Sequence, residues 1–166
     1  DPDSDNYYMT ISARLKGKQR EYNGCVAIVK SQKDLFHWKI LPPILAPGFY
    51  DEMETTQVIF HAGKVYLFFS THARNYKPDF ARYSGGAFGG LHCYFSSNLF
   101  GQYKPVNGNG VVLANEDEMY DVRLILSKDN DFFGIGWLRT KEGRYIGKMS
   151  APLKLRIDGD RIFKVD

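Results

Sequence analysis

Short runs of apolar and β-branched residues alternate along this chain with small clusters of glycine, proline, asparagine and aspartate. The runs recur about every ten residues, which is the spacing of short strands joined by tight turns. No segment shows a convincing helical period, so the pattern predicts an all-β fold of the sandwich, barrel or propeller type. We expect strands at 6–14, 24–30, 58–60, 64–70, 91–96, 111–113, 122–126, 132–138, 144–149, 153–157 and 161–165.

The turns between these runs add detail to the prediction. A Gly-Lys pair at Gly63 and Lys64 splits one apolar run and predicts a β-hairpin. Residues 39–47 contain three prolines, which fit only an edge segment because proline cannot donate to a strand ladder. Residues 71–90 predict a long loop, and loops of that length are usually functional or mobile.

Two segments resemble each other in outline. GCVAIVKSQKDL (24–35) and GGLHCYFSSNLF (89–100) each combine a small-residue strand with a turn, and each is followed by a proline-bearing stretch. Their offset of roughly 65 residues is that of a repeated four-stranded unit, and such repeats favour a β-propeller. We therefore predict a single all-β propeller segment over residues 1–166.

Composition excludes several classes of partner. With 43% hydrophobic residues, 25% charged residues and a net charge of +3, the 166-residue chain is typical of a globular domain without a nucleic-acid footprint. No apolar run approaches the roughly 20 residues of a membrane span, and the polar opening DPDSDN does not predict a signal peptide. Cys25 and Cys93 lie in apolar strands, so one disulfide and two buried thiols are both open.

The candidate chemistry lies in an acidic stretch. Asp51, Glu52 and Glu54 directly precede the strand that begins at Val58. Carboxylates at the mouth of a strand can divide acid and base roles when their surroundings differ. An acidic turn that keeps a sheet end soluble explains the same residues, and the pattern alone leaves both readings open.

Five motifs resemble, in the order of the chain, those of the levansucrase and inulosucrase family, glycoside hydrolase family 68. They are GCVAIVKSQKDLFHWKILPPIL, DEMETTQV, GKVYLFFSTH, GQYKPVNGNGVVLAN and APLKLRIDGD. The resemblance implies a five-bladed β-propeller of which this chain holds about three blades. It also implies sucrose as fructosyl donor, a covalent fructosyl-enzyme intermediate, and water, sucrose or fructan as acceptor.

The resemblance assigns roles to particular residues. Glu54 matches the general acid/base, and Asp1, which precedes Pro2, matches the aspartate that stabilises the transition state. Glu52 matches a carboxylate of the donor site. His72 matches a basic residue near the sugar, and Tyr120 matches a tyrosine beside the nucleophile. These types suit a retaining glycosidase, which needs two carboxyl groups and polar groups that bind a polyol.

The departures from the family matter as much. Thr55 occupies the substrate-binding position at which the family has an arginine, and threonine cannot form a bidentate clamp. The nucleophilic aspartate belongs to the first blade, which this chain does not contain. A second chain or self-association is therefore expected to complete the propeller. No cofactor is implied, although calcium near Asp51 stays open because some members bind it there.

Three functions follow as alternatives. The first is a levansucrase-type chain that acts on sucrose once its missing blades are supplied. The second is a non-catalytic propeller module that binds carbohydrate or protein, which Thr55 and the absent nucleophile favour. The third, an invertase or levanase, fits less well because those enzymes usually carry Cys-Pro-Asp where this chain has 55–57 as Thr-Thr-Gln. The family resemblance alone implies a secreted protein.

Overall fold

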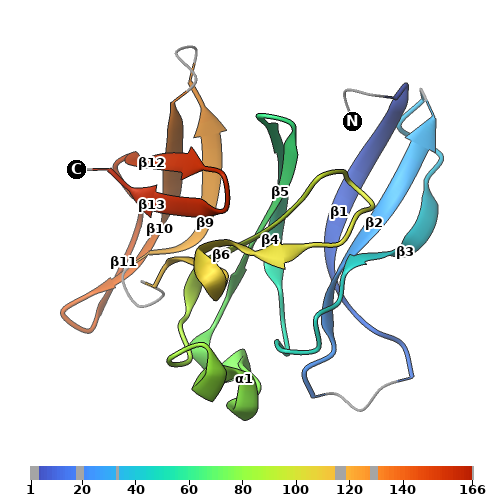
Figure 1. Cartoon of the computed structure of the whole chain (residues 1–166). Coiled ribbons are helices and arrows are strands. Elements are labelled where there is room, and N and C mark those ends of the chain that lie inside the picture. The colour runs from blue at the N-terminus through green and yellow to red at the C-terminus, as the bar shows by residue number, and fades with distance from the viewer. Residues whose placement is uncertain (1–3, 18–20, 33, 115–118, 128–130, 166) are drawn as a thin grey trace.

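The computed structural model describes residues 4–17, 21–32, 34–114, 119–127 and 131–165, and most of these residues lie in β-strands. Within this part of the chain, the strands form three antiparallel sheets (Figure 1). The sheets follow the order of the sequence, and the middle sheet shares a hydrophobic core with each of its two neighbours. The predicted predominance of strands is confirmed.

The first sheet has the order β1-β2-β3. Its strands are β1 (Asn6–Arg14), β2 (Gly24–Gln32) and β3 (Lys39–Leu45). The proline-bearing β3 lies at the edge of the sheet, as its sequence predicts. Proline has no backbone N–H to donate, and an edge strand needs hydrogen bonds to a neighbouring strand on one side only.

The middle sheet has the order β4-β5-β6-β7, with β8 also paired to β6. Its strands are β4 (Glu54–His61), β5 (Lys64–Thr71), β6 (Gly90–Ser96), β7 (Lys104–Pro105) and β8 (Val111–Leu113). The predicted hairpin is confirmed, since His61 pairs with Lys64 across the turn. The strand β4 begins earlier than predicted, so Glu54 lies in the sheet itself.

The third sheet has the order β11-β10-β12-β13, and β9 pairs with β10. Its strands are β9 (Met119–Leu126), β10 (Phe132–Lys141), β11 (Arg144–Met149), β12 (Leu153–Asp158) and β13 (Arg161–Lys164). The repeat seen in the sequence corresponds to equivalent strand pairs, because β2 pairs with the proline-bearing β3 and β6 pairs with the proline-bearing β7.

One prediction is wrong. The segment 71–90, expected to be loop, contains the short helix α1 (Pro78–Tyr83) and a 3-10 turn (Ala73–Asn75). Pro78 begins α1, where its missing N–H costs nothing, and Phe80 anchors the helix in the core. A helix of six residues is too short to show a period in the sequence. No helix in the described ranges is long and apolar enough to cross a membrane.

Two aromatic-rich cores hold the sheets together. Tyr66, Phe68 and Phe132 belong to the core between the middle and third sheets, and Met53 and Phe69 belong to the core between the first and middle sheets. Both cysteines are buried and free, which decides between the two alternatives left by the sequence. Burial also raises the pKa of the Cys93 thiol well above its usual value, so this thiol stays protonated and packs as an apolar group.

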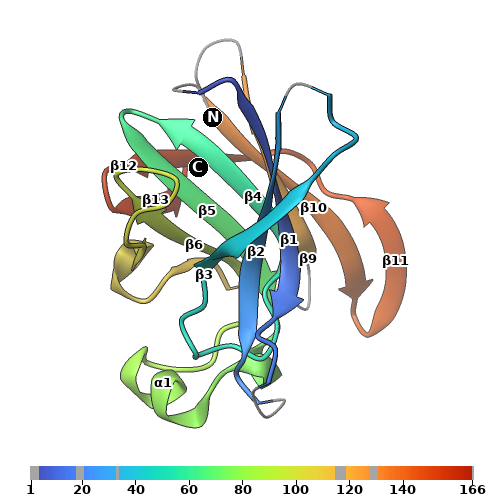
Figure 2. The same ribbon diagram turned by 90° about the vertical axis from the view of Figure 1, so that its right-hand side faces the viewer.

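The strands β1, β4 and β9, one from each sheet, lie next to one another (Figure 2). Gln57 of β4 joins two of the sheets: its side-chain nitrogen donates to the carbonyl of Leu124 on β9 at 2.8 Å, and its oxygen accepts from the Leu124 N–H at 2.9 Å. On the other side, the Thr56 hydroxyl donates to that of Thr10 on β1 at 2.9 Å. These bonds fix β4 relative to β9 on one side and to β1 on the other.

We expect the Gln57→Ala variant to lose about 2–3 kcal/mol of unfolding free energy. It removes two hydrogen bonds worth about 1 kcal/mol each and leaves both backbone groups of Leu124 without that partner. Urea denaturation measures the loss. Gln32→Ala, at the exposed end of β2, is the matched control and should change stability by less than about 0.5 kcal/mol. Equal effects of the two substitutions would contradict the bridging role.

Candidate active site

Two β-bulges face each other where β4 and β9 begin. The β4–β5 register shifts between Glu54 and Gln57, and Thr55 in that interval has φ of 47°. The β9–β10 register shifts as well, and Asp121 of β9 has φ of 52°. Bulges add a residue to one strand and redirect its side chain, and they are common next to active sites. Here they bring the Thr55 hydroxyl to 3.3 Å from Oδ1 of Asp121.

Glu54 and Tyr120 form the centre of the site. The Tyr120 hydroxyl donates to Oε2 of Glu54 at 2.5 Å. The ring of His72, which follows β5, stacks on that of Tyr120 with 4.4 Å between centroids and 7° between planes. The guanidinium of Arg139 on β10 lies 5.7 Å from the centroid of the same ring. The strands β4, β9 and β10 and the segment after β5 thus deliver an acid, a phenol, a cation and an imidazole to one place.

A pocket of about 330 Å³ opens over these groups. It is lined by Glu54, Thr55, His72, Tyr120, Asp121, Trp137, Arg139 and Tyr145. The structure therefore brings together four of the residues singled out from the sequence. It adds Asp121, Trp137, Arg139 and Tyr145, which sequence reasoning missed. The available signal was period-two alternation, since residues 137 and 139 share one face of β10.

Glu52 lies apart from this pocket in a separate ionic cluster. Its Oε1 accepts from the Arg14 guanidinium at 2.6 Å, and its Oε2 accepts from the Asn75 amide at 3.4 Å. The same guanidinium donates to Oδ1 of Asp51 at 2.7 Å. Arg14 thus ties the end of β1 to the segment that leads into β4.

The cation beside Asp51 in this structure is therefore Arg14. Oδ1 of Asp51 also accepts from the Tyr22 N–H at 3.3 Å. Among the described residues, no group of three or more histidine, cysteine, aspartate or glutamate side chains is arranged to hold a metal. Asp1, expected to stabilise the transition state, lies outside the described residues.

A buried polar network supports the segments on which the site is built. Nδ1 of His92 donates to the Gly90 carbonyl at 3.1 Å, so its Nε2 accepts from the Tyr76 hydroxyl. Burial lowers the pKa of His92 to about 4 and keeps the ring neutral. Tyr76 also forms a backbone bridge with Tyr50, which precedes the acidic stretch. The network therefore couples β6 to both the 72–76 turn and the 50–54 segment.

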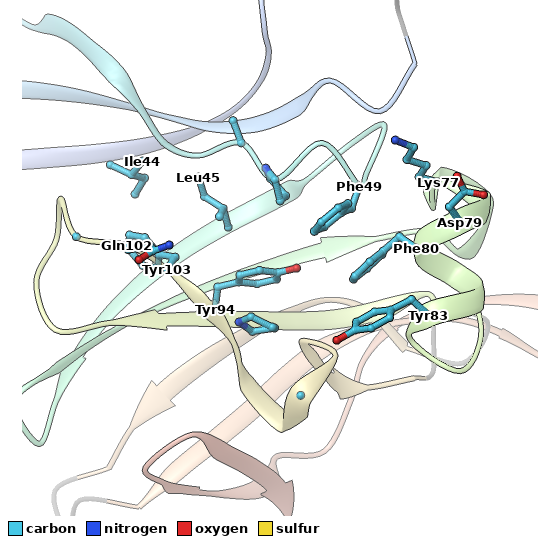
Figure 3. A pocket seen from close by; sticks show the side chains of 15 residues that line it. Ile44, Leu45, Phe49, Lys77, Asp79, Phe80, Tyr83, Tyr94, Gln102 and Tyr103 are labelled. Carbon is cyan, nitrogen blue, oxygen red and sulfur yellow. The ribbon is translucent and has the colours of Figure 1, made fainter.

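A larger pocket of about 650 Å³ lies elsewhere, between the β3–β4 connection, α1 and the segment that leads into β7 (Figure 3). Phe49 and Phe80 stack there with 4.2 Å between ring centroids, and Tyr83 is largely exposed. Its charged lining residues are Lys77 and Asp79. We place the chemistry in the smaller pocket, because that pocket combines a carboxylate, a phenol and an imidazole in mutual contact.

Residues 4–164 match the model of glycoside hydrolase family 68, described as levansucrase/invertase. The chain belongs to this family. The extracellular sucrase of Zymomonas mobilis is 42% identical over 141 residues, which are 80% of this chain and 33% of that protein. A levansucrase of Rahnella aquatilis is 33% identical over 156 residues, which are 89% of this chain and 36% of that protein. The chain thus spans about a third of the length of these relatives.

Solved structures show the same fold. An inulosucrase from Halalkalicoccus jeotgali, bound to kestose, has a TM-score of 0.85 at 23% identity. The match covers 99% of this chain and 47% of the inulosucrase chain. A levansucrase from Gluconacetobacter diazotrophicus has a TM-score of 0.86 at 16% identity. That match covers 99% of this chain and 43% of the levansucrase chain. The family-68 chain therefore has the fold of a little under half of each larger protein.

Proposed function

We propose that this family-68 chain carries the acid/base part of a site that transfers a fructosyl group from sucrose to water, to sucrose or to a growing fructan. The observation that carries the proposal is the Tyr120–Glu54 hydrogen bond of 2.5 Å between two residues that line an open, polar and aromatic pocket. The relatives called levansucrase and extracellular sucrase support this reaction class. The name of the latter also supports a secreted protein.

In the proposed reaction, a carboxylate nucleophile attacks the anomeric carbon of the fructosyl unit while Glu54, as a carboxylic acid, protonates the glycosidic oxygen. Glucose leaves, and Glu54 becomes a carboxylate. Glu54 then removes a proton from water or from an acceptor hydroxyl, which attacks the fructosyl-enzyme and releases the nucleophile. Tyr120 holds the Glu54 carboxyl in place through its hydroxyl, and His72 limits the position of the Tyr120 ring.

The nucleophile in this proposal comes from outside these 166 residues, on further blades of a five-bladed propeller in which the three sheets are neighbouring blades. Exposed apolar side chains on the outer sheets support such a completion. On β1 they include Tyr7, Met9 and Ile11, and on β9 they are Ile125 and Leu126. Apolar faces of this kind are typical of surfaces that pack against another sheet or chain.

A non-catalytic module that binds carbohydrate is the second candidate. Thr55 favours it, because the guanidinium found in the family is missing at that position. Arg139 offsets this loss in part, since it brings a guanidinium into the same pocket from β10. A catalytic test separates the two candidates.

The test is a chimera in which this chain replaces the matching segment of the Zymomonas mobilis extracellular sucrase. We expect the chimera to release glucose and fructose from sucrose, because the rest of the sucrase supplies the other blades. The unmodified sucrase is the positive control, and the 166-residue chain alone shows whether self-association suffices. A folded chimera that binds sucrose without cleaving it would favour the non-catalytic module.

A further inference from the structure

Two neighbouring residues in an unusual backbone conformation define a feature that the proposed reaction does not use. Thr55 and Asp121 both have φ near +50°. This conformation is uncommon for residues other than glycine, and it is strained for a β-branched residue such as threonine. Such strain persists only where the surrounding structure imposes it, and it gathers at ligand-binding sites. Both residues line the pocket beside Glu54.

The Asp121 carboxylate is held on one side only. Oδ1 accepts from the Thr55 hydroxyl at 3.3 Å, whereas within the described part of the chain Oδ2 accepts no hydrogen bond. The bulge at the start of β9 directs this side chain into the pocket and not along the ladder. The result is a fixed, half-buried carboxylate with an open acceptor oxygen.

We infer that Asp121 is a ligand-binding residue that accepts hydrogen bonds from hydroxyl groups of the sugar on the leaving-group and acceptor side of Glu54. Carbohydrate hydroxyls are donors that suit an anchored carboxylate, and a hydrogen bond to a charged group is stronger than one between neutral groups. Exposed Trp137 and Tyr145 line the same pocket and supply apolar surface for a sugar ring. The inference rests on the proposed function, because it places a second contact in the same site.

Thr55 is the residue that leaves Asp121 open. A threonine hydroxyl occupies a single oxygen of the carboxylate, whereas an arginine at this position could pair with both. The residue that departs from the family thus has a positive role in this chain: it orients Asp121 without neutralising it.

The test measures the affinity of the 166-residue chain for sucrose and for kestose by NMR titration. We expect Asp121→Asn to weaken binding about tenfold or more, since it replaces a charged acceptor by a neutral one. Asparagine tolerates positive φ, so the variant should keep the melting temperature of the parent. Thr55→Val, which removes the hydroxyl at constant shape, should weaken binding by a smaller factor.

A matched control makes the outcome decisive. Asp131→Asn, directly before β10 and paired with Lys154 at 2.7 Å away from the pocket lining, should bind as the parent does. If the parent binds and Asp121→Asn binds equally well, the assignment of Asp121 is overturned and the proposed function stands. If the parent binds neither sugar, both the assignment and the proposed sugar site of this chain are overturned.

Discussion

The Glu54→Gln variant of the chimera is expected to cleave sucrose about a thousandfold more slowly than the chimera itself. Glutamine keeps the shape of the side chain and cannot give a proton to the departing glycosidic oxygen. General acid catalysis is worth about 10²–10⁴ in rate, and sucrose has a poor leaving group that depends on it. Enzymatic assay of released glucose measures the effect.

A second substrate with a better leaving group distinguishes a catalytic acid at residue 54 from a carboxylate with a structural role only. An aryl fructoside with a good leaving group needs little protonation, so the burst of released phenol from Glu54→Gln should be less than about tenfold slower than that from the chimera. Glu142→Gln, at the exposed β10–β11 turn, is the matched control and should behave as the chimera does with both substrates. Equal loss on sucrose and on the aryl fructoside would show that Glu54 has a structural role.

The second large effect concerns the buried His92. Its pKa is about 4 in the folded protein and about 6.5 when the chain is unfolded. Between these values the unfolded chain binds more protons than the folded one, so stability is full above pH 6.5 and falls as the pH is lowered to 4. The loss is expected to reach about 3 kcal/mol, which follows from roughly 1.4 kcal/mol per unit of pKa.

The comparison with a variant isolates the contribution of His92 from that of the other titratable groups. His92→Gln should be less stable at pH 7, since the Tyr76 hydroxyl loses its ring acceptor, and it should lose less stability than the parent between pH 6.5 and 4. Urea denaturation at a series of pH values measures both slopes. Gln32→Ala, at the exposed end of β2, removes no titratable group and should keep the parental slope. Identical slopes for His92→Gln and the parent would contradict the account.

Most of the strands could be predicted because the alternation of apolar and polar residues within a segment shows which face of that strand is buried. The edge position of Lys39–Leu45 followed from its prolines. The helix Pro78–Tyr83 was missed because it has six residues, and its only buried anchor is Phe80. Strand starts were harder, since the bulge at Thr55 breaks the period just where β4 begins.

Only those residues of the site that lie in or beside the family motifs could be predicted from the sequence. Glu54, His72 and Tyr120 came from the family resemblance, and the structure finds them in contact. Asp121 could not be predicted, because it enters the pocket through a bulge that the sequence does not display. Alternation places Arg139 on the same face of β10 as Trp137, but the sequence does not show that β10 pairs with β9. The same holds for the Arg14 bridge to Glu52, which joins the end of β1 to the segment before β4 through residues far apart in the chain.

The proposed reaction requires sucrose to place its glycosidic oxygen against residue 54. A crystal structure of the Glu54→Gln chimera soaked with sucrose measures this directly. We expect the glycosidic oxygen to lie within hydrogen-bonding reach, about 3 Å, of the residue 54 side chain, with Tyr120 still bonded to that side chain. Sucrose bound with its glycosidic oxygen remote from residue 54, or held instead in the aromatic pocket of Phe49 and Phe80, would contradict it.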